Sequence, residues 1–424
     1  MRALFAALAV LVVAQQPPLM QDGGETPAVF RRFAGQVVKL QLVEASSGAR
    51  SVTGTGFYVS PRGHLMTNYH VISELVHEPA RYRAEMLREG APPLPVRVIA
   101  IDVVRDLAVV ATDSAAPSWF ALDSGAAPAQ GQRLYSLGHP GDLGIAIVEG
   151  TYNGRLPHTL YPRIHFTGSL NPGMSGGPTL TLAGRVVGVN VATAGNQQSF
   201  LVPVDGAAAL LTRALAAELP VDSLLADAGR QLLAYQDMYL GRLFVDSIQT
   251  VALGPWRAPT QPADFFNCWG DADRNEERPY EYIHHSCATD EDVFLSADQS
   301  SGVAQIEHTL ITTDELNRFQ FHALYTREFT GLGRDWELDA NGDDEVTGYR
   351  CHTGNVRTAG VTAKAVFCAR RYKRLAGLYD VVFRTAVIGR THQGLLSTLA
   401  LSGVSWENAQ SIVRRFSGAL AWNE

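Results

Sequence analysis

Between Val37 and Val204 the chain is a succession of short apolar runs, rich in β-branched residues and separated by turn residues. Gly, Pro, Asn or Asp stands between runs such as VVKLQLV, GTGFYV, VRVIAI, LAVVAT and RVVGVNVA. Short runs bounded by turn formers are typical of the strands of an all-β domain. Strands this numerous favour two closed barrels over one sheet. We therefore predict an all-β domain of two barrels over residues 30–220.

The hydrophobic period changes after this region. Gly206–Glu218 and Leu224–Tyr239 are rich in Ala and Leu at helical spacing, which predicts two helices. A chain of 424 residues is long enough for two domains. We place a helical linker at 221–255 and a second, smaller domain at 256–424.

The second domain is polar, acidic and rich in aromatic residues. We expect strands near 292–297, 304–310 and 318–325, which makes it a mixed α+β domain whose fold the sequence leaves open. The last segment predicts an αα-hairpin with a hinge at Ser402-Gly403 and with Ser405 as a helix N-cap. Its buried face would comprise Leu395, Leu396, Leu399, Ile412, Val413 and Phe416.

The first residues resemble a secretory signal peptide. One Arg is followed by an apolar run of about a dozen residues, which is shorter than the roughly 20 that a membrane-spanning helix needs. We expect cleavage after Ala14 and export to the periplasm or the extracellular medium, without stable membrane insertion. An uncleaved anchor or a buried first helix is the alternative.

All four cysteines lie in the second domain. Export to an oxidising compartment favours two disulfides, and four cysteines allow three connectivities. Pairing of sequence neighbours is the simplest of the three. We expect the pairs Cys268 with Cys287 and Cys351 with Cys368.

The strongest chemical signal is the segment NPGMSGGP, residues 171–178. A nucleophilic serine needs a sharply turned backbone whose amides point at the oxygen that becomes negative in the reaction. Ser175 is then the nucleophile, and the amides of Gly173 and Ser175 would form the oxyanion hole. The alternative is a glycine-rich turn without catalytic role.

A histidine and two aspartates complete the candidate set. His70 follows an apolar run and could accept the serine proton near neutral pH, although a lone histidine is more often structural. Asp102 and Asp106 stand near the start of the run LAVV, where an acid can orient the imidazole or merely cap a turn.

The strings GTGFYVSPRGHLMTNYHVI, RDLAVV and NPGMSGGP resemble the trypsin-like serine proteases of the HtrA (Deg) family over residues 30–215. The resemblance implies a double β-barrel, a catalytic triad of His70, Asp106 and Ser175, and no cofactor or metal. It also implies protein or peptide substrates. Met174 replaces the aspartate by which pancreatic relatives are activated, so that activation is not expected here.

Two features depart from that family. A PDZ domain is not recognisable beyond 220, where Tyr239-Leu240-Gly241-Arg242 is the one short similarity. The segment with cysteines takes its place. A catalytically weak binding or chaperone-like protein that acts through its C-terminal domain is therefore the alternative function, and oligomeric state stays open.

The resemblance also implies which residues line the substrate pocket. One wall would be Ser169 and Leu170, and the opposite wall Asn190, Val191 and Ala192. Ser169 stands where an aspartate would attract Lys or Arg, and a cation buried without a partner costs several kcal/mol. We expect small or medium aliphatic side chains to be preferred.

Other ligand classes fit the sequence poorly. The net charge of −7 disfavours nucleic acid. The acidic turn at 339–345 does not have the glycine at the sixth position and the glutamate at the twelfth position that a calcium-binding loop requires. His284, His285 and Cys287 match no common zinc spacing. We expect no metal.

Overall fold

The structure is a computed structural model. It describes residues 24–422 except 89, 124, 194, 196, 244–247, 274–277, 290, 332–340 and 359. The expected signal peptide at 1–14 lies outside the described residues. Among the residues that are described, no helix combines the length and the apolar character needed to cross a membrane.

Two closed antiparallel barrels of six strands each form the first half of the chain, as predicted. The first barrel contains, in spatial order, β1 (Val37–Glu44), β2 (Arg50–Tyr58), β3 (His64–Thr67), β6 (Leu107–Ala111), β5 (Leu94–Asp102) and β4 (Tyr82–Leu87). The second contains β10 (Pro178–Leu180), β11 (Val186–Thr193), β12 (Ser199–Pro203), β9 (Ile164–Phe166), β8 (Ala146–Arg155) and β7 (Arg133–Gly138). The short apolar runs form these strands, and closing each sheet into a barrel pairs the backbone groups of strands that would otherwise be edge strands.

Helices flank the barrels. They are α1 (Glu25–Phe33), the short 3₁₀ helix η1 (Ala34–Gln36), α2 (Ser73–His77), α3 (Val204–Ala216) and α4 (Val221–Leu240). The two helices predicted after Val204 are therefore present. Tyr239 and Leu240 are buried in the last turn of α4. The stretch that resembled a PDZ loop is thus the end of a packed helix.

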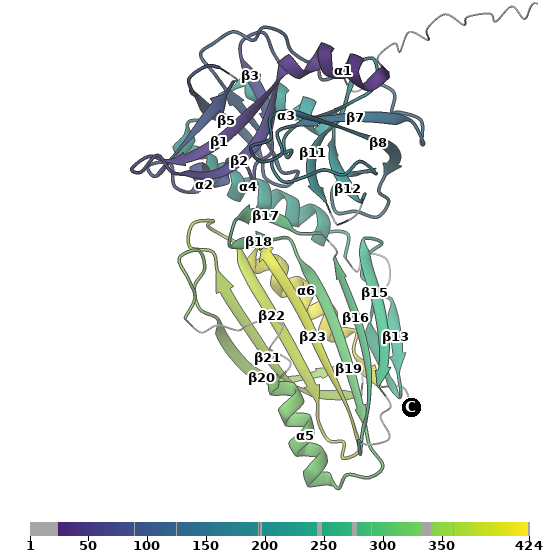
Figure 1. The fold of residues 1–424 in the computed structure, drawn as a ribbon. Coiled ribbons are helices and arrows are strands. Elements are labelled where there is room, and N and C mark those ends of the chain that lie inside the picture. Colours follow the sequence, from purple (N-terminus) through teal and green to yellow (C-terminus); the bar gives the residue numbers. More distant parts are fainter. Residues whose placement is uncertain are drawn as a thin grey trace, which may run out of the picture.

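The C-terminal lobe is built on a seven-stranded antiparallel sheet (Figure 1). Its spatial order is β15 (Phe266–Asp273), β16 (Glu281–Thr289), β19 (Ala304–Thr312), β23 (Gln393–Val404), β22 (Tyr379–Val387), β21 (Val361–Arg371) and β20 (Arg350–Thr358). A smaller sheet contains β13 (Thr250–Leu253), β14 (Trp256–Pro259) and β24 (Ala421–Trp422). The remaining elements are the hairpin of β17 (Val293–Ser296) and β18 (Gln299–Ser301), and the helices α5 (Arg318–Gly331) and α6 (Trp406–Gly418).

Two local predictions in this lobe are wrong. Residues 318–325 form the start of α5 rather than a strand, because Phe321, Leu324 and Tyr325 share one buried helical face. The first half of the expected αα-hairpin is strand β23, which is buried along almost its whole length. The second half is helix α6, and Ser405 caps it by accepting a hydrogen bond from the Asn408 amide at 3.2 Å.

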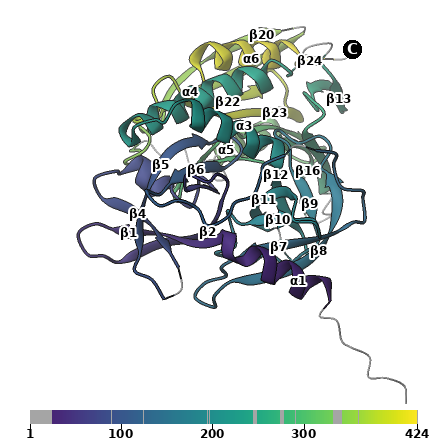
Figure 2. The ribbon, with the colours of Figure 1, turned by 90° about the horizontal axis from the view of Figure 1, so that it is seen from above.

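The helix α4 joins the two lobes. Figure 1 shows it between the barrels and the C-terminal sheet, and in Figure 2 it runs beside α6. Leu224, Leu232 and Tyr235 of α4 belong to one buried apolar cluster that contains residues of the first barrel and of the C-terminal sheet. The two lobes therefore share a continuous core through this helix.

Both predicted disulfides are present. Cys268 bonds to Cys287 across β15 and β16, and Cys351 bonds to Cys368 across β20 and β21. Each disulfide joins an edge strand of the seven-stranded sheet to its neighbour. The sheet is therefore cross-linked at both edges.

Candidate active site

The loop that carries Ser175 is held in a conformation that requires glycine. Gly173 and Gly176 have φ of 93° and 86°, a region that L side chains rarely adopt. A Cβ at Gly173 would lie 2.5 Å from the carbonyl oxygen of His139, and one at Gly176 would lie 2.2 Å from that of Thr55. The two glycines thus allow the close backbone approach that places Ser175 at the surface of the loop.

The amides of Gly173 and Ser175 are available as donors. The Pro172 carbonyl accepts a hydrogen bond from Gly141 at 3.2 Å, and the Met174 carbonyl accepts hydrogen bonds within the second barrel. The carbonyl and the amide of a trans peptide point in opposite directions, so the following N–H groups point away from these contacts. Over the described part of the chain, neither amide has a hydrogen-bond partner. Two such donors can stabilise an oxyanion.

His70 and Asp106 meet because their strands pair. His70 follows β3 and Asp106 precedes β6, and Thr67 of β3 lies opposite Ala108 of β6. His70 Nδ1 lies 2.6 Å from Asp106 Oδ2, and the His70 backbone amide donates to Oδ1 at 2.8 Å. The Asn68 side chain donates to the Asp106 carbonyl at 2.7 Å. These contacts fix the orientation of both side chains.

The same contacts select the protonation state of the histidine. Burial lowers the pKa of His70. The charge of Asp106 and its hydrogen bond together raise the pKa by more than burial lowers it, so the pKa of His70 is above its ordinary value. A proton on Nδ1 donates to Asp106 and leaves the Nε2 lone pair free to accept a proton. About a quarter of the His70 side chain is exposed.

Asp102 has a different role. Its carboxylate accepts a hydrogen bond from the Arg105 amide at 3.0 Å and forms an ion pair with the Arg105 guanidinium at 2.9 Å. It therefore caps the turn that leads to Asp106. Asp106 is the carboxylate that contacts His70.

Sequence reasoning did not identify Thr55 as part of the site. Its amide donates to the Ser175 carbonyl at 2.8 Å, and its hydroxyl donates to the Gly173 carbonyl at 2.7 Å. The His139 amide donates to the same hydroxyl at 2.9 Å. Thr55 of the first barrel thus holds the Ser175 loop of the second barrel. Its place in the string GTG was the available signal.

No hydrogen bond joins Ser175 Oγ to His70 among the described residues. The two residues belong to different barrels, and Thr55 fixes the loop of one against the other. Catalytic hydrogen bonds are often loose without substrate and shorten in the complex. A proton transfer between Ser175 and His70 therefore requires that contact to form when substrate binds.

The predicted pocket residues lie close to the loop but differ in exposure. Ser169 is exposed, whereas Leu170 and Val191 are nearly buried. Asn190 is fully buried, and its side chain bonds to Ser136, Leu137, Met174 and Thr179. The Asn190 side chain thus supports the second barrel, and its backbone amide and carbonyl bond to Gly177 and Gly176. Ala192 pairs with Phe200 in β11 and β12, and its side chain is outside the described structure.

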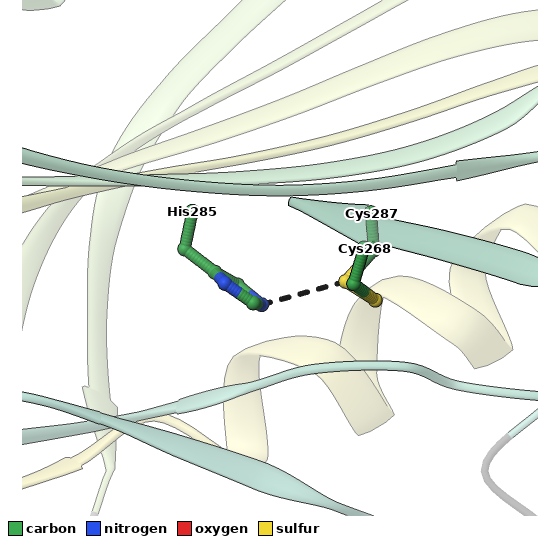
Figure 3. Close-up of side chains that lie close together, drawn as sticks. All are labelled: Cys268, His285 and Cys287. Atoms are coloured by element: carbon green, nitrogen blue, oxygen red, sulfur yellow. Dashed lines mark hydrogen bonds between the residues drawn. A yellow bond between two sulfur atoms is a disulfide. The ribbon is translucent and has the colours of Figure 1, made fainter. Parts of the chain in front are cut away.

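A second cluster of chemically active side chains lies in the C-terminal lobe. His285, Cys268 and Cys287 place their ligand atoms within 4.8 Å of one another (Figure 3). His285 Nε2 lies 2.6 Å from Thr260 Oγ1 and 3.4 Å from Cys287 Sγ. The two sulfurs form the disulfide, so neither is a thiolate that could bind a metal.

The comparisons with known proteins concern the barrels. Residues 54–189, which contain His70, Asp106 and Ser175, match the family model described as a trypsin-like peptidase domain. The chain is 30% identical over 203 residues to a Halomonas elongata protein named "Probable periplasmic serine endoprotease DegP-like", covering 44% of this chain and 42% of the relative. A Chlamydia pneumoniae protein of the same name is 27% identical over 183 residues, covering 41% and 34%.

Among solved structures, a serine endoprotease from Yersinia pestis aligns over 45% of this chain and 66% of its own, with 20% identity and a TM-score of 0.39. The chain spans less than half the length of the two curated relatives. The family model and the two curated relatives support the resemblance that the motifs indicated. Residues 54–189 are similar to a trypsin-like peptidase domain, and this half of the chain is similar to DegP-like serine endoproteases.

Proposed function

We propose that this chain is an exported serine endopeptidase that hydrolyses peptide bonds through an acyl-enzyme intermediate. The observation that carries the proposal is the arrangement around Ser175. The amides of Gly173 and Ser175 have no hydrogen-bond partner among the described residues, and a His70–Asp106 pair at 2.6 Å stands at the ends of two adjacent strands of the first barrel. These are the parts that acyl transfer requires.

The first half of the reaction forms the acyl-enzyme. Ser175 Oγ attacks the scissile carbonyl carbon while His70 Nε2 takes the hydroxyl proton, and the carbonyl oxygen becomes negative. The amides of Gly173 and Ser175 stabilise this oxyanion. The C–N bond then breaks, and the protonated imidazole gives its proton to the leaving amine. Asp106 stabilises the imidazolium without accepting its proton.

Water completes the cycle. His70 accepts a proton from the water that attacks the ester carbonyl, and the oxyanion uses the same two amides. When the ester bond breaks, His70 returns the proton to Ser175 Oγ, which releases the carboxylic acid. The groups that act in this scheme all belong to the two barrels.

The pocket supports a preference for small or medium aliphatic side chains before the scissile bond. Ser169, six residues before the nucleophile, carries no charge that could pair with a buried Lys or Arg. We expect Leu170 and Val191, both buried, to narrow the space beside it. A fitted methylene group is worth only about 1 to 3 kcal/mol, so the preference should be broad. Exposed or unfolded protein segments are the substrates that such a site suits.

A fluorophosphonate probe tests the proposal directly. It phosphonylates an activated serine, so the purified protein should be labelled on Ser175 and the Ser175→Ala variant should not. Equal labelling of both proteins, or none of the wild type, would refute the endopeptidase and favour a non-catalytic binding protein.

A further inference from the structure

We propose that Phe294, a residue of the C-terminal lobe, is a specificity-determining residue of the proteolytic site. It forms an apolar wall beside His70 for the substrate side chain that precedes the one in the main pocket. This inference rests on the proposed endopeptidase activity. It assigns to the C-terminal lobe a direct part in substrate selection.

The ring of Phe294 contacts the catalytic histidine. Its centroid lies 5.9 Å from that of His70, with the two planes at 73°, and 6.4 Å from that of Tyr69. Phe294 lies in β17, whose neighbouring side chains Val293 and Leu295 are fully buried. Alternate residues of a strand point to opposite faces. Val293 and Leu295 therefore anchor β17 in the shared core, while the partly buried Phe294 packs against the edge of that core and contacts His70.

The segment around β17 is bound to both barrels. Tyr69 Oη of the first barrel donates to the Leu295 carbonyl at 3.0 Å. Tyr161 Oη of the second barrel donates to the Asp292 carbonyl at 2.9 Å, and the Leu160 amide donates to Glu291 at 2.7 Å. Figure 1 shows β17 and β18 at the junction of the two lobes. Phe294 is thus held beside His70 by contacts on both sides.

Contacts from the following strands keep the β17–β18 hairpin in place. The Val303 amide donates to Ser402 Oγ at 2.8 Å, and the Ser402 amide donates to the Val303 carbonyl at 2.8 Å. Arg374 also donates to the His77 carbonyl of the first barrel. A side chain positioned by a rigid scaffold can select substrates without an ordering cost on binding.

The geometry indicates which substrate residue meets Phe294. In an extended peptide whose residue before the scissile bond enters the pocket near Ser169, the adjacent side chains point to the opposite face. We infer that His70 and Phe294 lie on this face. The β17 segment bonds to residues 160 and 161, which precede β9, and β9 is joined through β12 to β11. Phe294 is therefore on the β11 side, along which the residues before the scissile bond would run.

Access to the nucleophile is preserved. Ser175 is partly exposed, and about a quarter of the His70 side chain is exposed beside the Phe294 ring. The ring forms a wall and does not cover the site. Its apolar face gains from contact with Leu, Ile or Val and desolvates a charged side chain without a partner.

Cleavage of matched peptides tests the assignment. The peptides share Val before the scissile bond and carry Leu, Ala or Asp at the preceding position. The wild type should prefer Leu over Ala there, and Phe294→Ala should reduce the Leu to Ala ratio of kcat/KM about tenfold. Phe294→Leu should keep most of the ratio. Phe319→Ala, which removes an exposed ring on α5, should leave it unchanged.

The ratio separates specificity from folding, because loss of folded enzyme lowers kcat/KM for all peptides equally. Unchanged ratios in active Phe294→Ala and Phe294→Leu proteins would overturn the inference. Failure of the proposed function has a different signature, namely a wild type without cleavage that depends on Ser175.

Discussion

Asp106 combines an unusual backbone with the orientation of His70. Its φ is 57°, in the left-handed region that non-glycine residues rarely occupy, and both carboxylate oxygens bond to His70. Such conformations persist where surrounding contacts over-determine them, and they cluster at functional sites. The Asn68 side chain supplies one of these contacts by bonding to the Asp106 carbonyl.

Asp106→Asn should therefore reduce kcat by roughly 10⁴-fold, because the amide no longer stabilises the imidazolium or selects its tautomer. Asp102→Asn should change kcat less than about tenfold, because the Asp102 carboxylate bonds to Arg105 and has no contact with His70 among the described residues. Steady-state hydrolysis of one peptide by both purified variants checks this. The reverse ranking would show that the wrong carboxylate has been assigned.

The pKa of His70 predicts how the reactivity of Ser175 depends on pH. Only the neutral imidazole can accept the Ser175 proton, and its pKa lies above the ordinary value of about 6.5 because of Asp106. The rate of fluorophosphonate labelling should fall as pH decreases, with a midpoint above about 6.5. In Asp106→Asn the midpoint should move to lower pH. A wild-type midpoint below 6.5, or one that Asn leaves in place, would contradict the coupling.

At the level of residues, the sequence could predict those groups whose function requires particular residue types next to them in the chain. Gly173 and Gly176 are required by the turn, so the motif around Ser175 is legible in the chain itself. Thr55 and Phe294 were not recognised, because their roles arise from contacts with residues more than a hundred positions away. The string GTG marks the place of Thr55 but not its contacts, and nothing around Phe294 in the sequence marks it.

At the level of elements, the disulfide of β20 and β21 has a structural consequence. Almost all side chains of β20 are exposed, so this edge strand buries little apolar surface. Cys351 and Cys368 lie opposite each other in the ladder and are separated by 17 residues in the chain. A loop of this size is closed with a stabilisation of about 3 kcal/mol.

The double variant Cys351→Ser/Cys368→Ser should lose about 3 kcal/mol of unfolding free energy, since the unfolded chain regains the entropy of the open loop. Urea unfolding of both proteins measures this difference. Both proteins under reducing conditions provide the control, because the difference between them should disappear once the Cys351–Cys368 bond of the wild type is reduced. A difference below about 0.5 kcal/mol would show that β20 is held by other contacts.

Element types were predictable where one periodicity dominated. The barrel strands alternate with clear turn residues, and α3 and α4 show an unbroken helical period. Leucines in β23 were assigned to a helix because a strand buried on both faces has no alternation to reveal it. In α5, the alternate residues Phe319 and Phe321 suggested the period of a strand. The buried residues are Phe321, Leu324 and Tyr325, which have helical spacing.

At the scale of the whole molecule, α4 couples the stability of the two lobes because it packs against both. It packs against β5 of the first barrel and against β23 and α6 of the C-terminal lobe. Composition indicated a domain boundary after 220. The periodicity of α4 predicted a helix with one buried face but did not indicate what that face packs against. Which surfaces it joins depends on both lobes being folded.

Leu232→Ala should therefore destabilise both lobes together. Leu232 is 2% exposed within the shared core, and removing such a side chain costs about 2 to 5 kcal/mol. Hydrogen exchange should accelerate in β5 and β23 alike. Leu215→Ala, at an exposed position of α3, is the matched control and should have little effect. Acceleration confined to one lobe would contradict a shared core.

The most direct test of the account is the turnover of a denatured protein substrate by wild type and Ser175→Ala protein, purified in parallel. Ser175 Oγ is the attacking atom, and what survives its loss is the oxyanion hole and substrate binding. The account predicts that the variant keeps its fold and loses roughly four to six orders of magnitude in kcat/KM. Proteolysis by Ser175→Ala at a rate near that of the wild type would contradict it.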